Sequence, residues 1–84
     1  MYRIVPDAAT IDQVAALPIE ALLPYSEILT VLELDPWAGE PQHRGNPDGA
    51  VRRWIFGPEG AGQLVYLVVE DRREVHLLRV LWLG

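Results

Sequence analysis

The chain has no cysteine and no lysine among its 84 residues. Without cysteine it forms no disulfide bonds and no zinc site built on thiolates. Without lysine, arginine is the only fixed cationic side chain, and the excess of acidic residues gives a net charge of −5. Nucleic-acid binders draw affinity from summed positive charge. Any such binding would therefore have to come from a local arginine patch.

The sequence also lacks a long hydrophobic run. No segment approaches the roughly 18–20 consecutive apolar residues of a membrane span. The chain starts with a short strand-like run rather than a charged stretch followed by a long apolar one, so we expect no secretory signal. His43 and His76 have no further ligands at metal-binding spacing. We expect a cytoplasmic protein with no membrane segment, bound metal or cofactor.

The hydrophobic content that is present suffices for one core, because apolar residues make up 50% of the chain. A chain of this length buries only about 60–65% of the surface that its unfolded form exposes, so its stability should be modest. We expect a single domain over residues 1–84.

The first half of the chain predicts one strand and two helices. Residues 2–5 are aromatic and β-branched, which favours a short strand, and Asp7 then suits a helix N-cap. Apolar residues follow at helical spacing, namely Ala8, Ile11, Val14 and Ala15. Pro18 separates this helix from a second one. The two make an αα-hairpin.

Pro24 lies inside the second predicted helix. Proline removes a backbone hydrogen bond and clashes with the preceding turn, so we expect a kink or a break near Leu23, with residues 25–34 as the solid part. The apolar face of this helix comprises Leu22, Leu23, Ile28, Leu29, Val31 and Leu32.

The second half predicts three strands after a loop over residues 37–48, which is rich in proline and glycine. The strands cover residues 51–56, 63–69 and 74–83, and short turns join them into an antiparallel meander. The fold class is α+β with the order β-α-α-β-β-β and a mainly antiparallel four-stranded sheet. We expect three tryptophans to close the core where helices meet sheet, and these residues to be buried: Leu29, Val31 or Leu32, Ile55, Val65, Leu67, Leu77 and Val80.

Two segments of the second half carry a family resemblance. RGNPDG at residues 44–49 resembles the glycine loop that precedes the second strand of toxins of the RelE/ParE superfamily. QLVYLVVEDRREVHLLRV at residues 63–80 resembles their apolar hairpin, and Leu64-Val65-Tyr66 is the best single match. The predicted order of elements is also similar to theirs, over essentially the whole chain.

The resemblance implies a toxin of a type II toxin–antitoxin system. RelE-like members cut mRNA in the ribosomal A site with basic groups and a late tyrosine or histidine. ParE-like members inhibit DNA gyrase and lack that catalytic set. Both kinds are usually held inactive by a co-encoded antitoxin.

Three arginines are the candidate catalytic residues that the resemblance implies. Arg52 and Arg53 lie in the first strand of the meander, where alternation sends their side chains to opposite faces. Basic residues at this place in RelE-like toxins stabilise negative charge on the scissile phosphate. Arg79, on the last strand, would supply further charge. The alternative is that the three arginines are structural. Of Arg52 and Arg53, one would be exposed and the other paired with a helix carboxylate, and Arg79 would lay its stem on apolar surface and pair with an acid.

The chain departs from the catalytic pattern at several positions. Gln63 stands where most RelE-like toxins have an arginine, and glutamine cannot neutralise a phosphate. Leu83 and Gly84 stand where the resemblance places proton-transferring residues. Histidine is a common general base because its ordinary pKa lies near neutrality, but a lone strand histidine such as His76 is more often structural.

We therefore expect a toxin or toxin-like protein that acts by binding an antitoxin-like protein, with weak or no mRNase activity. Its cellular target would be the ribosome with its mRNA, or DNA gyrase. Two copies would form a homodimer where no antitoxin covers the apolar surface. The alternative is a non-enzymatic protein-interaction module that has kept the fold.

Overall fold

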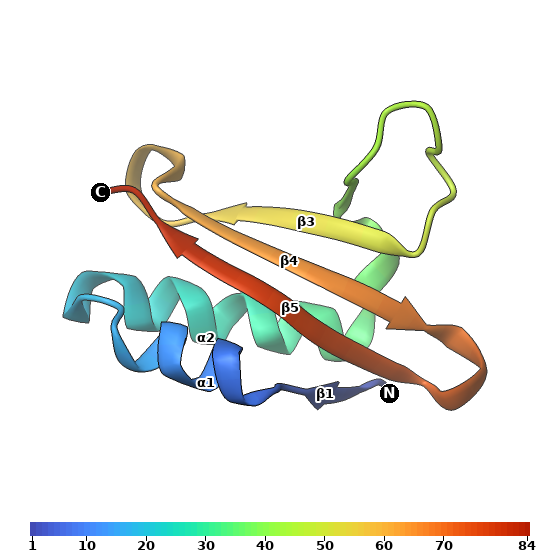
Figure 1. Ribbon diagram of the computed structural model, residues 1–84, viewed down its shortest axis with the longest axis horizontal. Helices are drawn as coiled ribbons and strands as arrows, with labels where there is room; N and C mark the ends of the chain where they lie inside the picture. Colours follow the sequence, from blue (N-terminus) through green and yellow to red (C-terminus); the bar gives the residue numbers. More distant parts are fainter.

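The computed structural model describes all residues, 1–84, and contains two helices and one sheet (Figure 1). The helices and strands, in chain order, are β1 (Arg3–Val5), α1 (Ala8–Ala15), α2 (Ile19–Leu34), β2 (Glu40–Pro41), β3 (Val51–Phe56), β4 (Gly62–Val69) and β5 (Glu74–Trp82). Three short 3-10 turns, η1 (Pro36–Ala38), η2 (Pro58–Gly60) and η3 (Glu70–Arg72), lie between them. The predicted α+β class is confirmed, and so is the predicted element order apart from the additional strand β2.

The sheet has five strands in the order β1-β5-β4-β3-β2. The long strands β3, β4 and β5 pair antiparallel in sequence order, whereas β1 pairs parallel with β5. The expectation of four strands is wrong by one. Glu40 and Pro41, predicted as loop, pair with Arg53 and Arg52 of β3. A two-residue strand carries no alternation that a sequence pattern can detect.

Both helices lie on the same side of the sheet (Figure 1). Asp7 caps α1 as predicted, because its Oδ1 accepts from the Thr10 backbone N–H at 2.8 Å while the Thr10 hydroxyl oxygen accepts from the Asp7 N–H. The expected apolar stripe of α1 is largely outside the core, and Ile11 is 56% exposed. The Gln13 side chain instead accepts a hydrogen bond from the backbone N–H of Val80, which covers part of the free edge of β5.

The second helix does not break at its proline. α2 continues through Pro24, so the expected interruption near Leu23 is wrong. Proline removes one hydrogen bond here, in the second turn, and the packing of the face that follows offsets that loss. That buried face repeats at helical spacing and comprises Ala21, Tyr25, Ile28 and Leu32.

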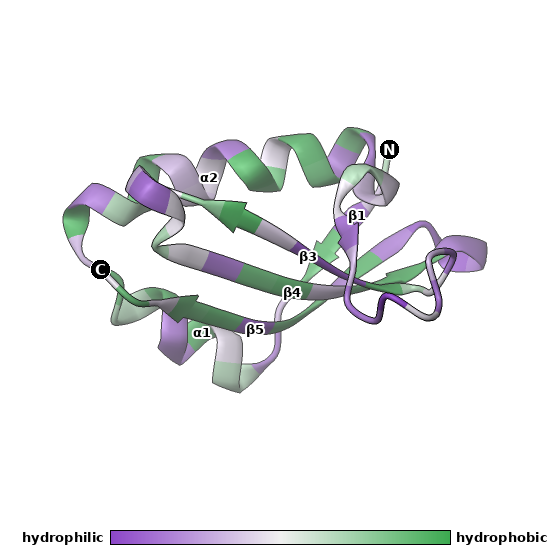
Figure 2. Ribbon diagram, turned by 90° about the horizontal axis from the view of Figure 1, so that it is seen from above, coloured by the Kyte–Doolittle hydropathy of each residue, from purple (hydrophilic) through white to green (hydrophobic).

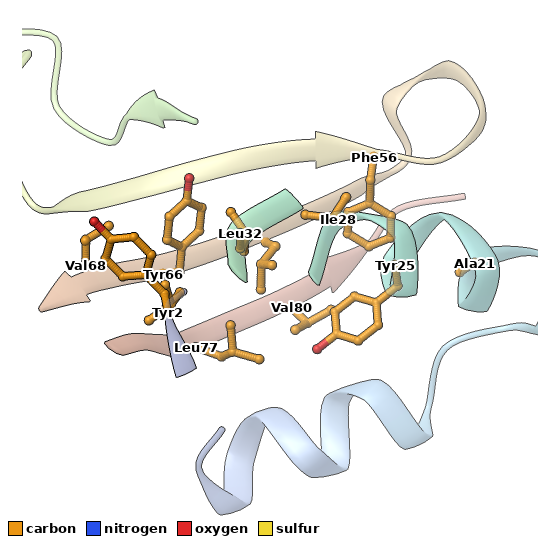
Figure 3. Close-up of a cluster of buried hydrophobic side chains, with 12 residues drawn as sticks. Tyr2, Ala21, Tyr25, Ile28, Leu32, Phe56, Tyr66, Val68, Leu77 and Val80 are labelled. Carbon is orange, nitrogen blue, oxygen red and sulfur yellow. The ribbon is translucent and has the colours of Figure 1, made fainter. Parts of the chain in front are cut away.

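The core lies between α2 and the helix-facing side of the sheet (Figure 3). Leu32, Leu64 and Tyr66 are fully buried at its centre. Tyr25 packs against Phe56 with ring centroids 5.9 Å apart. As expected, all three tryptophans are partly buried against this core, at Trp37, Trp54 and Trp82.

The sequence predicted only some of the strand residues that face the core. Leu77 and Val80 are buried as predicted, although three positions separate them. A bulge makes this possible: Tyr66 pairs with Leu77 and Val65 with Arg79, so Leu78 has no partner and the alternation shifts by one. Of the α2 alternatives, Leu32 is buried and Val31 is 38% exposed.

On β3 and β4 the expected inward residues point the other way. Ile55 is 44% exposed, and Val65 and Leu67 lie on the side of the sheet without helices. The buried residues of β4 are Leu64, Tyr66 and Val68. Because all six residues from 64 to 69 are apolar or aromatic, the sequence of β4 does not distinguish its two faces.

The segment after α2 is fixed to the core by a buried tyrosine. The Tyr66 hydroxyl donates to the carbonyl of Pro36 at 2.7 Å, and burial raises the pKa of Tyr66 to about 12. A Cβ added to Gly39 would lie 1.9 Å from this hydroxyl oxygen. Only glycine therefore lets the chain pass close enough to bring Glu40 alongside β3.

Candidate functional site

The open face of the sheet is the candidate site; the term denotes the side of β3, β4 and β5 turned away from both helices. Seen from above, no helix lies in front of these strands (Figure 2). Alternation places every second residue here. The apolar members are Val51, Ile55, Val65, Leu67, Val69 and Leu81; Ile55 is exposed and the others are half-buried.

One row across the open face carries two of the predicted arginines. Glu40 pairs with Arg53, Arg53 with Val65, and Val65 with Arg79. Arg53 and Arg79 thus lie one on each side of Val65, with backbones two strand spacings apart, or about 9–10 Å. Arg53 forms an ion pair with Glu40 at 3.3 Å, whereas Arg79 is exposed and has no acidic partner within 4.0 Å.

The third candidate, Arg52, lies on the opposite side of the sheet. It is buried, at 8% exposure, and its Nη1 and Nη2 donate to the carbonyls of Gly39 and Pro47, each at 2.8 Å. Its guanidinium also lies 5.1 Å from the centre of the Trp37 ring. The prediction that the adjacent arginines point to opposite faces is confirmed. The structure brings Arg53 and Arg79 together and holds Arg52 apart as an anchor of the loop.

Gln63 lies in the next row of the open face. It pairs with Ile55 on one side and Leu81 on the other. This row therefore offers a neutral amide between two apolar side chains. No third cation joins the arginine row from this side.

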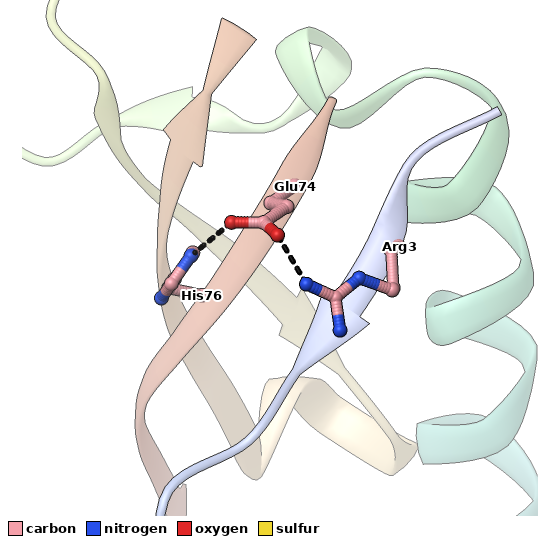
Figure 4. A network of polar contacts seen from close by, with 3 residues as sticks. All are labelled: Arg3, Glu74 and His76. Carbon is pink, nitrogen blue, oxygen red and sulfur yellow. Dashed lines mark hydrogen bonds and ion pairs between the residues drawn. The ribbon is translucent and has the colours of Figure 1, made fainter. Parts of the chain in front are cut away.

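A polar network occupies the other end of the open face (Figure 4). Glu74 is 8% exposed and accepts from Arg3 of β1 through one carboxylate oxygen. Its other oxygen lies 2.9 Å from Nε2 of His76. His76 pairs with Leu67, which is two residues from Val65 along β4, or about 6–7 Å from the arginine row.

The network keeps the Glu74 carboxylate charged. Its hydrogen bond with His76 and then that with Arg3 hold the pKa of Glu74 below its usual range. A charged carboxylate at 2.9 Å fixes the orientation of the His76 ring. The open face thus carries an oriented imidazole beside two arginines.

The sequence offered part of the signal for this network. Glu74 and His76 are two residues apart on a predicted strand, so their side chains share a face. Arg3 was not predictable as their neighbour, because no local pattern announces the parallel pairing of β1 with β5. Glu40 was missed for the same reason as β2.

The arrangement suits binding of an anionic or mixed surface. Two forked guanidinium groups across a strand can bracket a carboxylate or a phosphate, and apolar side chains lie around them. The described chain contains no group of three or more histidine, cysteine or acidic side chains that could hold a metal ion. Neither α1 nor α2 has the length and apolar character of a membrane-spanning helix.

Comparisons with known proteins point to the fold. No protein-family model matches the chain, and no curated protein matches its sequence. Among solved structures, the crystal structure of the isolated RelE toxin of E. coli superposes with a TM-score of 0.78. The match covers 100% of this chain and 86% of the RelE chain, at 14% sequence identity. The chain therefore has a RelE-like fold.

Proposed function

We propose that this protein is a toxin-like component of a type II toxin–antitoxin system that binds a protein partner on its open face. The observation that supports this most directly is the combination of a RelE-like fold with an uncovered sheet face that carries apolar side chains and two arginines. The partner is an antitoxin-like chain whose apolar segment covers Val65 and Leu67.

The charges of the open face define this partner further. The protein carries a net charge of −5, yet Arg79 is free of acidic neighbours and Arg53 has one exposed partner. A partner segment with a carboxylate beside its apolar residues would complement both arginines. Such complementarity gives specificity and a faster association rate more than raw affinity.

The test uses two matched substitutions. The chain is co-expressed with the product of the adjacent reading frame, and complex formation is measured by pull-down and by relief of growth inhibition. Leu67→Glu on the open face should abolish the complex, whereas Leu23→Glu, on the exposed side of α2, should preserve it. If the complex were lost only in Leu23→Glu, the partner would bind the helices rather than the open face. No complex and no growth effect with the unmodified chain would refute the proposal.

A second candidate function, ribosome-dependent mRNA cleavage, is favoured by one observation. His76, oriented by Glu74, lies on the same face as Arg53 and Arg79, and an imidazole can transfer protons near neutral pH. Gln63 and the scarcity of cations on this acidic chain argue against efficient cleavage. We expect weak or no activity.

Primer extension on translated message decides between them. Cuts in the ribosomal A site that disappear in both Arg79→Ala and His76→Gln would establish the nuclease, with a loss of about 10²–10⁴-fold for the histidine change. If the chain bound an antitoxin or DNA gyrase but cut no mRNA, it would be a toxin-like binding protein without nuclease activity. A different protein partner would make the chain an interaction module that has kept the fold.

A further inference from the structure

The edge of β3 has a gap in its backbone pairing. β2 pairs with β3 only at Arg52 and Arg53, and the N–H of Gln42 donates to the carbonyl of Val51 at 3.0 Å. Continuing this register, residue 38 would lie opposite Ile55. Ala38 instead belongs to η1. In Figure 1 the segment after α2 lies near the start of β3, and the arrowhead end of β3 has no strand beside it on the edge away from β4.

The gap exposes the hydrogen-bonding groups of one residue. Because the Val51 carbonyl points toward Gln42, alternation directs the N–H and C=O of Arg53 and Ile55 to the same edge. Arg53 is opposed by Glu40, whereas Ile55 has no strand opposite it. A cavity of about 190 Å³ occupies this place, and its lining is Ala38, Gly39 and Glu40 on one side and Arg53, Trp54 and Ile55 on the other.

Gly39 lies in the lining of the cavity and restricts what can enter it. A Cβ built on Gly39 would lie 2.9 Å from the carbonyl oxygen of Arg53. The backbone of Gly39 therefore occupies the place next to the gap along the edge of β3. A strand that continued in line with β2 would collide with it. A second copy cannot place its own β3 here either, because antiparallel pairing centred on Ile55 would require the position opposite Arg53 that Glu40 holds. The occupant must end in the gap.

We propose that the gap binds the free C-terminus of an extended partner chain. Its last residue, running antiparallel to β3, donates its N–H to the carbonyl of Ile55. Its terminal carboxylate accepts from the Ile55 N–H and from the guanidinium of Arg53, whose only acidic partner is the exposed Glu40 at 3.3 Å. Its side chain is apolar, because it lies beside the half-exposed Ile55 on the open face.

This inference rests on the proposed function only in that the partner is a protein. The probes are synthetic hexapeptides with randomised sequences and an apolar last residue, prepared as free acids and as C-terminal amides, and titrated against the full chain by NMR. The free acids should bind and shift the Ile55 amide resonance. Amidation should weaken binding by about tenfold or more, the usual value of a hydrogen bond to a charged group. The proposal would be refuted if none of the free-acid peptides bound, or if the free acids and the amides bound equally well.

Four variants locate the site. Ile55→Pro removes the edge N–H without touching the β3–β4 ladder and should weaken binding about tenfold, while Ile55→Val keeps that N–H and should weaken binding by much less than tenfold. Arg53→Gln should weaken binding of the acids to the level of the amides, and Glu40→Gln, which frees Arg53, should strengthen it. Unchanged binding by both Ile55→Pro and Arg53→Gln would overturn the assignment.

A peptide-side measurement covers the case in which Ile55→Pro does not fold. N-methylation of the last residue should abolish binding, because that N–H meets the Ile55 carbonyl, whereas N-methylation of the preceding residue should be tolerated. Equal sensitivity at the two positions would contradict strand pairing. Leu67→Glu, which tests the open face, should leave peptide binding unchanged, so the two proposals fail separately.

Discussion

Leu64 and Leu67 lie on the same strand but on opposite faces, and truncating each measures which face is the core. Leu64 is fully buried and faces α2, whereas Leu67 is half-buried on the open face. Leu64→Ala loses the transfer free energy of the side chain and leaves a cavity, which together cost about 2–5 kcal/mol. Leu67→Ala leaves no enclosed cavity, and part of its transfer free energy, about 1–1.5 kcal/mol, is the expected cost.

These costs are large for a domain of this size. At about 0.05–0.15 kcal/mol per residue, an 84-residue chain has roughly 4–13 kcal/mol of unfolding free energy. Leu64→Ala could therefore remove half of it. The assay is urea denaturation followed by tryptophan fluorescence, with the slope against denaturant unchanged in both variants. Equal losses in the two variants, or a larger loss for Leu67→Ala, would refute the assignment of the faces.

Three further predictions follow from individual contacts. Arg52→Ala should cost about 2–4 kcal/mol because it removes two hydrogen bonds from a buried cation, while Arg53→Ala should cost about 1 kcal/mol or less; both are read from urea midpoints. Gly39→Ala should cost about 1–3 kcal/mol through its clash with the Tyr66 hydroxyl, measured by the shift in melting temperature. The pKa of Glu74 is lowered in the folded state, so its stabilising contribution is complete above its unfolded value, near pH 4.5, and is lost as the pH falls through the lower folded value. Glu74→Gln should therefore flatten the decline of stability between about pH 5 and pH 3; an unchanged decline would contradict this.

The sequence predicted the elements well because their signals are local. Asp7 caps α1 through a contact three residues away, and the turns between β3, β4 and β5 lie where glycine, proline and charged residues interrupt apolar runs. The break at Pro24 was wrong because the packing of α2 on the sheet outweighs a local cost. Tertiary burial decided what helix propensity alone could not.

The sequence indicated which residues belong to the candidate site but not how they lie relative to one another. Arg53 and Arg79 are 26 positions apart in the sequence, and only the register of β3 and β5 against β4 shows that they flank Val65. That register includes a bulge at Leu78, which no sequence pattern marked. Without the bulge, residue 79 would project to the helix side of the sheet.

Arg52 and Arg53 illustrate how the fold assigns roles to adjacent identical side chains. Both have the same chemistry, but a strand sends them to opposite faces. On the helix side, Arg52 finds two backbone carbonyls and an aromatic ring, which occupy its donors. On the open face, Arg53 finds only an exposed carboxylate.

The RelE-like fold, shared at 14% sequence identity, sets where the backbone elements lie. The side chains that this chain places on those elements decide its chemistry. The open face of this chain carries two cations across one strand, so it can hold an anionic group. Its neighbouring row consists of Ile55, Gln63 and Leu81, which offer apolar surface and a neutral amide where phosphate chemistry would need more positive charge. A face of this composition gains more from an apolar segment that carries a carboxylate than from a polyphosphate backbone, since burial of the apolar side chains adds to the charge pairing only in the first case. The composition of the open face therefore supports the proposal of a protein ligand rather than RNA.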